Sequence, residues 1–223
     1  MLQSLNLLFF LSLAAPPGLQ AYTEAQPSEV AQALQKKYET IRDFSAEFTH
    51  SYVGGVLRQQ VTERGTVLIK KPGRMKWTYS SPDYKLFVSD GYKLYSYIPQ
   101  DKQVIVSSVP TEDEASTPVL FLAGKGNLAR DFTASFTELA GAPESAYVLK
   151  LVPRKPEREY DWLVLVVDRD SLRLRMLATS DVQGGRSTFT FNNLRENVGL
   201  SDKEFTFKIP RGVDVVSGGP KSQ

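Results

Sequence analysis

The chain has 223 residues, with 27 Lys and Arg against 25 Asp and Glu, one His and no Cys. This balance of charge gives the chain no overall bias toward polyanions. The lack of Cys excludes disulfides and thiol chemistry, and with a single His it excludes a His- and Cys-rich metal site. The sequence also lacks a Gly-x-Ser-x-Gly turn, a phosphate loop and a dinucleotide fingerprint. We therefore expect a protein that is not an enzyme and uses no metal or cofactor.

Residues 1–21 contain no Asp, Glu, Lys or Arg. The apolar run from Leu5 to Ala15 has the length of a signal-peptide core and is too short to span a bilayer. We predict cleavage after Ala21, which leaves one domain in a bacterial periplasm. An uncleaved anchor is the alternative, because Leu19 fits a small-x-small cleavage site poorly.

An amphipathic helix is predicted next. Ser28 can cap it, and Val30, Leu34, Tyr38 and Ile41 follow at helical spacing on one face. Charged and amide residues fill the other face. A helix of this kind needs a sheet to lie on.

Short alternating runs then predict strands over most of the chain. Phe44, Ala46 and Phe48 alternate with polar residues and mark the first strand, and a second strand ends near Lys70. The run at 162–167 is apolar at odd and even positions alike, so both faces of the predicted strand are apolar. We expect one face to line the interior and the other to lie beneath a helix. Beyond the aromatic region, strands are predicted at residues 103–107, 132–139, 147–152, 162–167, 172–179, 187–192 and 204–209.

The region from residue 70 to residue 99 is the richest in aromatic side chains, and Pro-Gly, Ser-Pro and Asp-Gly turns divide it. Such a pattern predicts antiparallel strands with a bulky apolar face, bent enough to enclose something. For Met75, Trp77 and Tyr79, ordinary core packing is an equally good interpretation. The residues predicted to line the enclosed space are Phe48, Met75, Trp77, Tyr79, Leu86, Val88 and Leu94.

A short apolar helix is predicted at residues 116–124, between a hydroxyl cap and Gly124. A helix of this length is unstable alone, so both of its faces need apolar contact. It could cover the enclosed space or simply pack on the core. The residues assigned to this lid are Pro118, Val119, Leu120, Phe121 and Leu122.

Together these elements predict a mainly β fold, an incomplete antiparallel β-barrel of about eleven strands with an N-terminal helix and a short helical lid. Residues 22–216 would form this half-barrel domain, followed by a disordered tail at 217–223 that is rich in Gly, Pro and Ser. A barrel of this size can be filled by side chains or can hold a ligand, and the pattern alone leaves both open.

Several segments in their order along the chain resemble the periplasmic outer-membrane lipoprotein carrier family, the LolA-type chaperones. The resemblance runs from DFSAEF at residues 43–48 to FTFKIPRGV at 205–213. Its most specific segments are KPGRMKW at 71–77, VSDG at 88–91 and TPVLFL at 117–122.

This resemblance implies a carrier that takes triacylated lipoproteins from an inner-membrane ATP-driven lipoprotein-releasing complex and passes them to an outer-membrane lipoprotein receptor. Acyl chains would lie in the cavity predicted above. The family often has an Arg that holds the lid, at the position of Lys71 in this chain. Because Lys offers a point charge rather than a planar fork of donors, we expect a latch that is looser or absent, with a solvated Lys71 as the alternative. We also expect a monomer that binds no nucleic acid.

The physical case for a carrier is the cost of exposing acyl chains to water. A chain of sixteen carbons costs roughly 12 kcal/mol in water, at about 0.8 kcal/mol per methylene. An alternative function is an envelope sensor of lipids or lipoproteins on the same fold, although such regulators usually carry a further domain.

The polar residues of the strands have plainer interpretations. We interpret His50 as a packed strand residue rather than a ligand or base. A basic set is interpreted as a solvated sheet face, with a partner or headgroup role as the alternative; it consists of Arg58, Arg64, Lys70, Lys71, Arg74, Lys76 and Lys85.

Overall fold

The computed structural model describes residues 25–56, 58–109, 121–124, 126–157, 160–181 and 183–218. The predictions for the signal peptide, for Pro118, Val119 and Leu120, and for residues 219–223 lie outside these ranges. The helical elements are α1 (Pro27–Thr40), α3 (Leu128–Asp131), η1 (Pro99–Asp101) and η2 (Asp202–Phe205). The strands are β1 (Asp43–Val53), β2 (Gln60–Lys70), β3 (Arg74–Ser81), β4 (Lys85–Asp90), β5 (Lys93–Ile98), β6 (Gln103–Ser108), β7 (Phe132–Phe136), β8 (Ala146–Pro153), β9 (Trp162–Asp168), β10 (Leu174–Ser180), β11 (Arg186–Glu196) and β12 (Asp214–Ser217).

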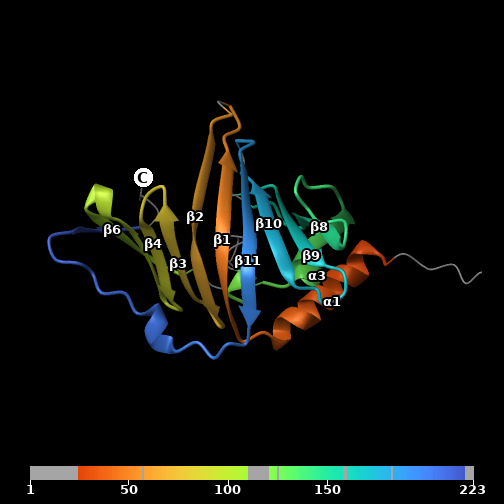
Figure 1. The fold of residues 1–223 in the computed structure, drawn as a ribbon, viewed down its shortest axis with the longest axis horizontal. Helices are drawn as coiled ribbons and strands as arrows, with labels where there is room; N and C mark the ends of the chain where they lie inside the picture. The colour runs from red at the N-terminus through yellow and green to blue at the C-terminus, as the bar shows by residue number, and fades with distance from the viewer. Residues whose placement is uncertain are drawn as a thin grey trace, which may run out of the picture.

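All twelve described strands belong to one sheet, in the order β12-β6-β5-β4-β3-β2-β1-β11-β10-β9-β8-β7 (Figure 1). Neighbours run antiparallel except for β12, which pairs with β6 in parallel. Within the described chain the edges β12 and β7 do not pair with each other, so the sheet stays open. The mainly β, incomplete-barrel prediction is confirmed, with twelve strands rather than about eleven.

The helix α1 forms where the apolar spacing predicted it, but it begins two residues earlier than a cap at Ser28 implies. Pro27 occupies its first position, where a missing N–H costs nothing, and Glu29 accepts a hydrogen bond from the Gln26 N–H at 3.0 Å. Ser28 therefore lies inside the first turn instead of capping it. Val30 and Leu34 are buried, as predicted.

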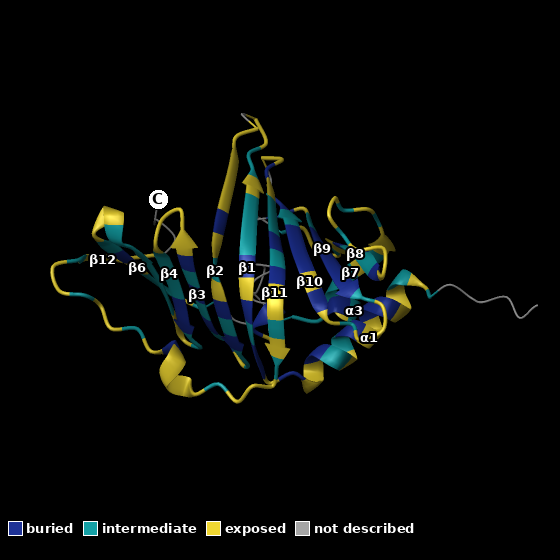
Figure 2. Cartoon of the chain, in the orientation of Figure 1, coloured by how far each residue is buried: buried dark blue, intermediate teal, exposed yellow. Residues whose placement is uncertain are grey.

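The face of the sheet that packs against α1 is called the inner face here. Residues paired across strands share a face, so the register assigns each side chain to one side. The inner face carries the main core (Figure 2). Its buried strand residues include Phe44, Ala46, Phe48, Val67, Ile69, Met75, Trp77, Leu149, Leu165, Leu177, Phe189 and Phe191.

The strand β9 is buried on both faces, as its unbroken apolar run indicated. On the outer face Val164 and Val166 pack with Met176, and the cover comes from Leu139 and Ala142 in the loop after β7. The prediction that a helix lies over this face is wrong. The helix α1 lies on the inner face instead, and a loop with two small apolar contacts is enough to cover the outer one.

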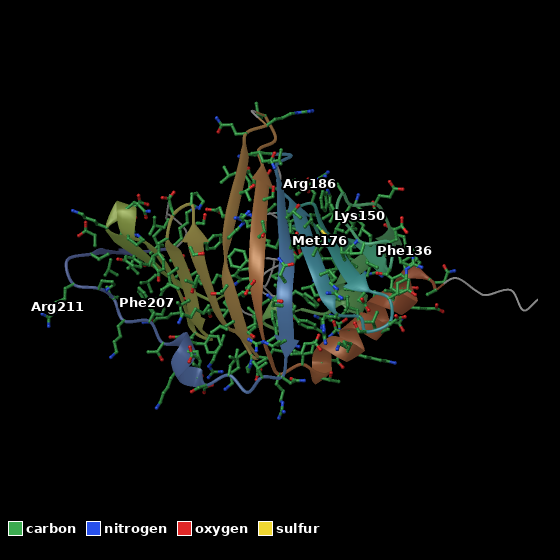
Figure 3. The ribbon with its side chains drawn as sticks, viewed as in Figure 1. Phe136, Lys150, Met176, Arg186, Phe207 and Arg211 are labelled. Carbon is green, nitrogen blue, oxygen red and sulfur yellow. The ribbon has the colours of Figure 1, made fainter. Side chains whose placement is uncertain are left out.

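The predicted strand at 204–209 is also wrong. Its alternation arises because Phe205 in η2 is buried beside β3 and β4, while the ring of Phe207 lies 5.4 Å from that of Tyr95 (Figure 3). The segment thus packs on the sheet without joining it. Strand pairing resumes in β12, and the Gly218 N–H still donates to the Val106 oxygen at 2.7 Å, so the ordered chain extends beyond residue 216.

No helix of the described residues has the length and apolar character needed to cross a membrane.

Two neighbouring positions on β8 test this assignment of faces. Leu149 is fully buried on the inner face, whereas Val152 is 41% exposed. We expect Leu149→Ala to lower the free energy of unfolding by about 2–5 kcal/mol, because it leaves a cavity in the core. We expect Val152→Ala to change it by about 0.5 kcal/mol or less. Urea unfolding measures both, and equal effects would contradict the assignment.

Candidate functional site

An aromatic cluster occupies the middle of the inner face. The ring centroid of Phe48 lies 5.2 Å from that of Trp77, 4.9 Å from Tyr79 and 5.9 Å from Phe189, each in an edge-to-face arrangement. This geometry suits the quadrupole of aromatic rings. Gly65 stands opposite Phe48 in the register, and a Cβ there would lie 2.8 Å from the Phe48 ring. The sequence therefore leaves out a side chain where the ring needs space.

The indole of Trp77 brings an unsatisfied polar atom into this cluster. Trp77 is 4% exposed, and its Nε1–H is buried without a hydrogen-bond partner in the described part of the chain. Burying such a donor unpaired costs about 1–3 kcal/mol. The cluster is therefore built of apolar rings, but it contains one N–H group that is free to donate a hydrogen bond to a ligand.

The residues predicted to line the enclosed space divide between the two faces. Phe48, Met75, Trp77 and Tyr79 meet in one buried cluster, and Leu94 shares their face through its pairing with Ser89, opposite Met75.

Leu86 and Val88 were assigned to the wrong face. They pair with Thr78 and Lys76, so they lie on the outer face. Phe87 pairs with Trp77 and packs against the inner cluster in their place. The error arose because three successive apolar residues carry no period-2 signal.

The cover of the inner face converges on Tyr38, near the end of α1. Its hydroxyl donates to the Leu122 oxygen at 2.9 Å, and its ring stacks on Phe121 with centroids 4.6 Å apart. Burial, together with the charge of Glu196, raises the pKa of Tyr38 well above its usual value, so the hydroxyl stays a donor. Sequence analysis placed Tyr38 on the buried face of the helix but missed this contact.

Residues 121–124 form the second part of the cover. Phe121 and Leu122 are helical and buried, as the lid prediction expected of these two residues. The Gly73 N–H, in the turn between β2 and β3, donates to the Ala123 oxygen at 2.9 Å. The segment is therefore tied to the sheet as well as to α1.

Lys71, the expected latch residue, contacts α1 and packs on the lid segment. Its Nζ donates to the Tyr38 backbone oxygen and lies 3.8 Å from the centroid of the Tyr38 ring. A cation at the last turn of a helix is favoured by the free carbonyls there. The methylenes of Lys71 lie beside Gly124. A Cβ added to Gly124 would lie only 2.9 Å from the Lys71 Cδ. Partial burial lowers the pKa of Lys71 to about 8.

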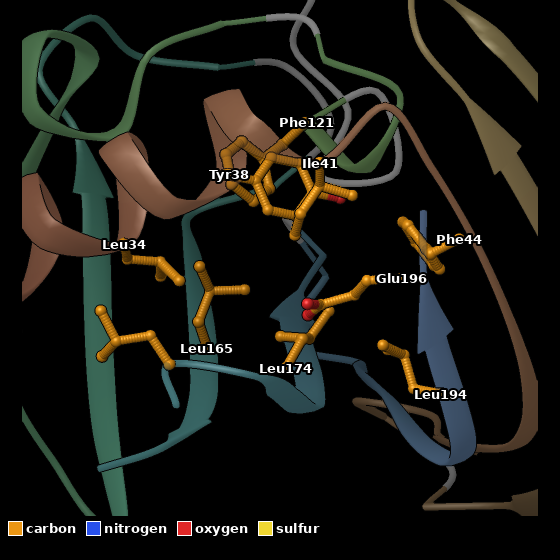
Figure 4. Close-up of a pocket in the computed structure, with 10 residues that line it drawn as sticks. Leu34, Tyr38, Ile41, Phe44, Phe121, Leu165, Leu174, Leu194 and Glu196 are labelled. Carbon is orange, nitrogen blue, oxygen red and sulfur yellow. The ribbon is translucent and has the colours of Figure 1, made fainter. Parts of the chain in front are cut away.

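A small cavity remains beneath this cover (Figure 4). Its free volume is about 10 Å³, roughly the space that one water molecule needs. At this place the side chains of the described residues fill most of the space between α1 and the sheet. The lining consists of Leu34, Tyr38, Ile41, Phe44, Phe121, Leu165, Leu172, Leu174, Leu194 and Glu196.

A larger hollow of about 390 Å³ lies between the loop after β7 and strands β10 and β11. Asp168, Arg175 and Asn192 line it together with Met176. Asp168 and Arg175 form an ion pair there, with 3.3 Å between their oxygen and nitrogen. Charged walls of this kind do not suit a long apolar ligand.

A polar cluster lies on the inner face beyond the aromatic rings. Glu63 is 7% exposed, and its carboxylate oxygens lie 2.5 Å from the Lys85 Nζ and 3.1 Å from the His50 Nδ1. The His50 Nε2 lies 2.6 Å from the Ser187 Oγ. The register explains the meeting, since β1 lies between β2 and β11 and pairs His50 with Glu63. Sequence analysis missed the cluster and assigned Lys85 to a solvated face.

The order Ser187, His50 and Glu63 also resembles a hydrolase triad, but the surroundings are unsuitable. Ser187 lies within β11, where it pairs with Tyr52 of β1 and Thr179 of β10. Backbone donors at such a position are used by the sheet, which removes the usual oxyanion donors. We therefore interpret these three residues as a buried hydrogen-bonded network.

Comparison with known proteins places this architecture in a family. The family model described as outer membrane lipoprotein carrier protein LolA matches residues 39–208. The chain belongs to the LolA family. LolA-type lipoprotein carriage is not an enzymatic activity, and membership implies a periplasmic protein with lipoprotein cargo.

Individual LolA-family relatives match over almost their whole length. The outer-membrane lipoprotein carrier protein of Chromohalobacter salexigens is 30% identical, over 93% of this chain and 94% of its own. That of Hahella chejuensis is 28% identical, over 97% and 100%. A crystal structure of an uncharacterized conserved protein from Thermus thermophilus superposes with a TM-score of 0.52 at 12% identity, covering 84% of this chain and 98% of that chain, which shows the shared fold alone.

The Tyr38 hydroxyl gives a direct test of the cover. We expect Tyr38→Phe to weaken closure by about 1 kcal/mol, because the Leu122 oxygen loses its donor while the ring stacking remains. Binding of an apolar fluorescent dye should increase by roughly fivefold. Tyr92→Phe is the control, since Tyr92 is 81% exposed. Equal dye binding by both variants would contradict the role of Tyr38.

The polar cluster predicts how stability changes in mild acid. Burial lowers the pKa of His50 below 6.5, even though Glu63 opposes this shift. The unfolded chain then binds more protons than the folded one, so stability should fall as the pH drops below about 6.5. His50→Gln removes the only His and should flatten the curve between about pH 7 and pH 5. Urea unfolding across this range measures the difference, and parallel curves would refute the prediction.

Proposed function

We propose that this LolA-family protein carries triacylated lipoproteins with their acyl chains against the inner face, beneath α1 and the lid. It would receive them from an inner-membrane ATP-driven lipoprotein-releasing complex and deliver them to an outer-membrane lipoprotein receptor. The observation that carries the proposal is the continuous apolar inner face under a cover held by few polar contacts.

The closed state accounts for how such a carrier releases its cargo. With a cavity of about 10 Å³, loading must displace parts of the cover such as Phe121 and Tyr38. Each large side chain that loses its burial costs about 1.5–3 kcal/mol. This cost offsets part of the roughly 12 kcal/mol gained by burying a chain of sixteen carbons. The net affinity is then lower than burial of the acyl chains alone would give, which favours transfer.

The acyl-chain site consists of Phe48, Met75, Trp77 and Tyr79, with Leu94 at its edge. The lid comprises residues 118–122, of which Phe121 and Leu122 support the assignment by their contacts with α1. Lys71 acts as the latch through Tyr38, because it binds the same residue that holds Leu122. Release of either contact frees the other.

The route to the periplasm is part of the same proposal. Residues 1–21 serve as a cleaved signal peptide, on the evidence of their uncharged, apolar sequence. The mature protein then acts as a monomer that shuttles between the two membranes.

Co-expression with a tagged lipoprotein tests the carrier function. We expect the acylated lipoprotein to co-purify with this protein in a soluble complex, while the same cargo with its lipidated Cys replaced by Ser does not. Mass spectrometry of the complex should find all three acyl chains. Equal recovery of both cargo forms, or of neither, would refute the proposal.

Trp77 provides a second test because the chain has two Trp residues on opposite faces. Trp162 lies on the outer face, where Lys150 and Arg186 flank its ring at 5.7 and 5.6 Å (Figure 3). In Trp162→Phe protein, binding of a synthetic triacylated lipopeptide should change the emission of Trp77. In the matched Trp77→Phe protein the emission should stay constant. The reverse result would place the acyl chains on the outer face.

A further inference from the structure

The polar cluster of Glu63, Lys85, His50 and Ser187 joins directly onto the aromatic cluster. His50 stacks on Phe189 with centroids 4.2 Å apart, and the Trp77 ring approaches Phe189 at 5.2 Å. The Lys85 Nζ lies 5.9 Å from the Tyr79 ring centroid. An acyl chain lying on the aromatic rings therefore reaches charged groups at one end of its path.

This end of the inner face is also its opening to solvent. Two residue pairs further along β1 and β2 from His50 and Glu63, Tyr52 and Val61 face the same side and are exposed by 36% and 45%. The cluster thus marks the boundary between the buried core and the solvent. An amphipathic ligand with its tail on the rings would place its polar head here.

The cluster carries paired charges with no net charge when His50 is neutral. The Glu63 carboxylate balances the Lys85 ammonium, and both carboxylate oxygens are already engaged. Since a carboxylate only accepts, the neutral His50 donates from Nδ1 to Glu63 and accepts at Nε2 from the Ser187 hydroxyl. His50 and Ser187 therefore fix the carboxylate rather than offer donors.

Among the described residues, Lys85 and Trp77 have donors left for a ligand. Lys85 uses one of three N–H groups on Glu63, and its side chain is 30% exposed. Trp77 offers an Nε1–H that is buried and has no partner among the described residues. A ligand that supplies carbonyl acceptors and no charge satisfies both donors without disturbing the ion pair.

We propose that Lys85 and Trp77, with Glu63 as the fixed counterion, form a seat for the uncharged ester and amide carbonyls at the head of a triacylated cysteine. This inference rests on the proposed carrier function and names what the site selects. A phospholipid with a phosphate brings a negative charge close to Glu63, whose partner Lys85 is already neutralised. The seat thus selects against anionic phospholipids, which carry acyl chains of the same kind on a negatively charged head.

Two probes of equal acyl length separate these ligands. One is a synthetic tripalmitoyl-S-glyceryl-cysteinyl peptide with uncharged residues and an amidated end, and the other is dipalmitoyl phosphatidylglycerol. Because the first has three acyl chains and the second two, the role of the head is read from how the ratio of their dissociation constants changes between variants. Dissociation constants are measured by the Trp77 emission of Trp162→Phe protein. We expect that protein to bind the lipopeptide at least tenfold more tightly than the phospholipid.

Glu63→Gln gives the decisive change because it leaves the Lys85 charge unbalanced. We expect phosphatidylglycerol to bind about tenfold more tightly than before, through a charge-assisted contact, and to gain affinity relative to the lipopeptide, which brings no negative charge to Lys85. A role limited to holding the fold would shift both ligands together. Melting curves confirm that the variant remains folded.

Lys85→Met removes the donor while keeping most of the side-chain stem. We expect lipopeptide binding to weaken about tenfold, the loss typical of one hydrogen bond to a charged group. Lys93→Met is the matched control, because Lys93 is exposed on β5, and it should bind both ligands like the parent. If the unpaired Glu63 unfolds Lys85→Met, the double variant Glu63→Gln/Lys85→Met keeps the test, with the same expected loss for the lipopeptide.

The outcomes separate the two proposals. Failure of the Trp162→Phe protein to bind either ligand would refute the carrier proposal itself. Tight binding of the lipopeptide with an unchanged ratio of the two dissociation constants in Glu63→Gln would overturn the seat and leave the carrier function in place.

Discussion

The contacts of Tyr38 hold together the two parts that cover the inner face. Its hydroxyl binds Leu122, its ring stacks on Phe121, and its carbonyl accepts from Lys71. Twelve strands with one apolar face would expose a large patch without such a cover. Because one residue carries all three contacts, loss of one weakens the geometry of the others. The cover of the extensive apolar face therefore depends on these few contacts of Tyr38.

The energetics of this arrangement differ from those of a preformed pocket. In the proposed carrier the described side chains largely fill the space beneath α1, leaving a cavity of about 10 Å³, so cargo and side chains would compete for the same surface. Binding then exchanges one apolar contact for another, and the net gain is much smaller than the gross hydrophobic term. Lys71 adds a point contact where family resemblance implied an arginine fork. A loose closure of this kind suits a protein that must give up what it binds.

The sequence was sufficient for the fold class and for the burial of Phe48, Met75 and Trp77, because both depend on local alternation. Phe48, Met75 and Trp77 alternate cleanly and lie where their periodicity placed them. Leu86 and Val88 lie in an unbroken apolar run, so only pairing with β3 decides their face. Phe205 and Phe207 alternate like residues of a strand, yet they pack on the sheet without joining it. An alternating apolar pattern shows only that every second side chain is buried, and it does not show that the backbone pairs with a strand.

The polar cluster is a second feature that the sequence alone could not predict. Its members come from β1, β2, β4 and β11, and no local pattern links His50, Glu63 and Lys85 before the register is known. Burying an ion pair costs desolvation that its own attraction offsets only with good geometry. The unpaired Nε1–H of Trp77 adds to that cost within the same face. Apolar residues at these positions would avoid the desolvation cost if the surface only had to bind apolar groups. The retained polar side chains therefore indicate that this end of the face contacts a polar group.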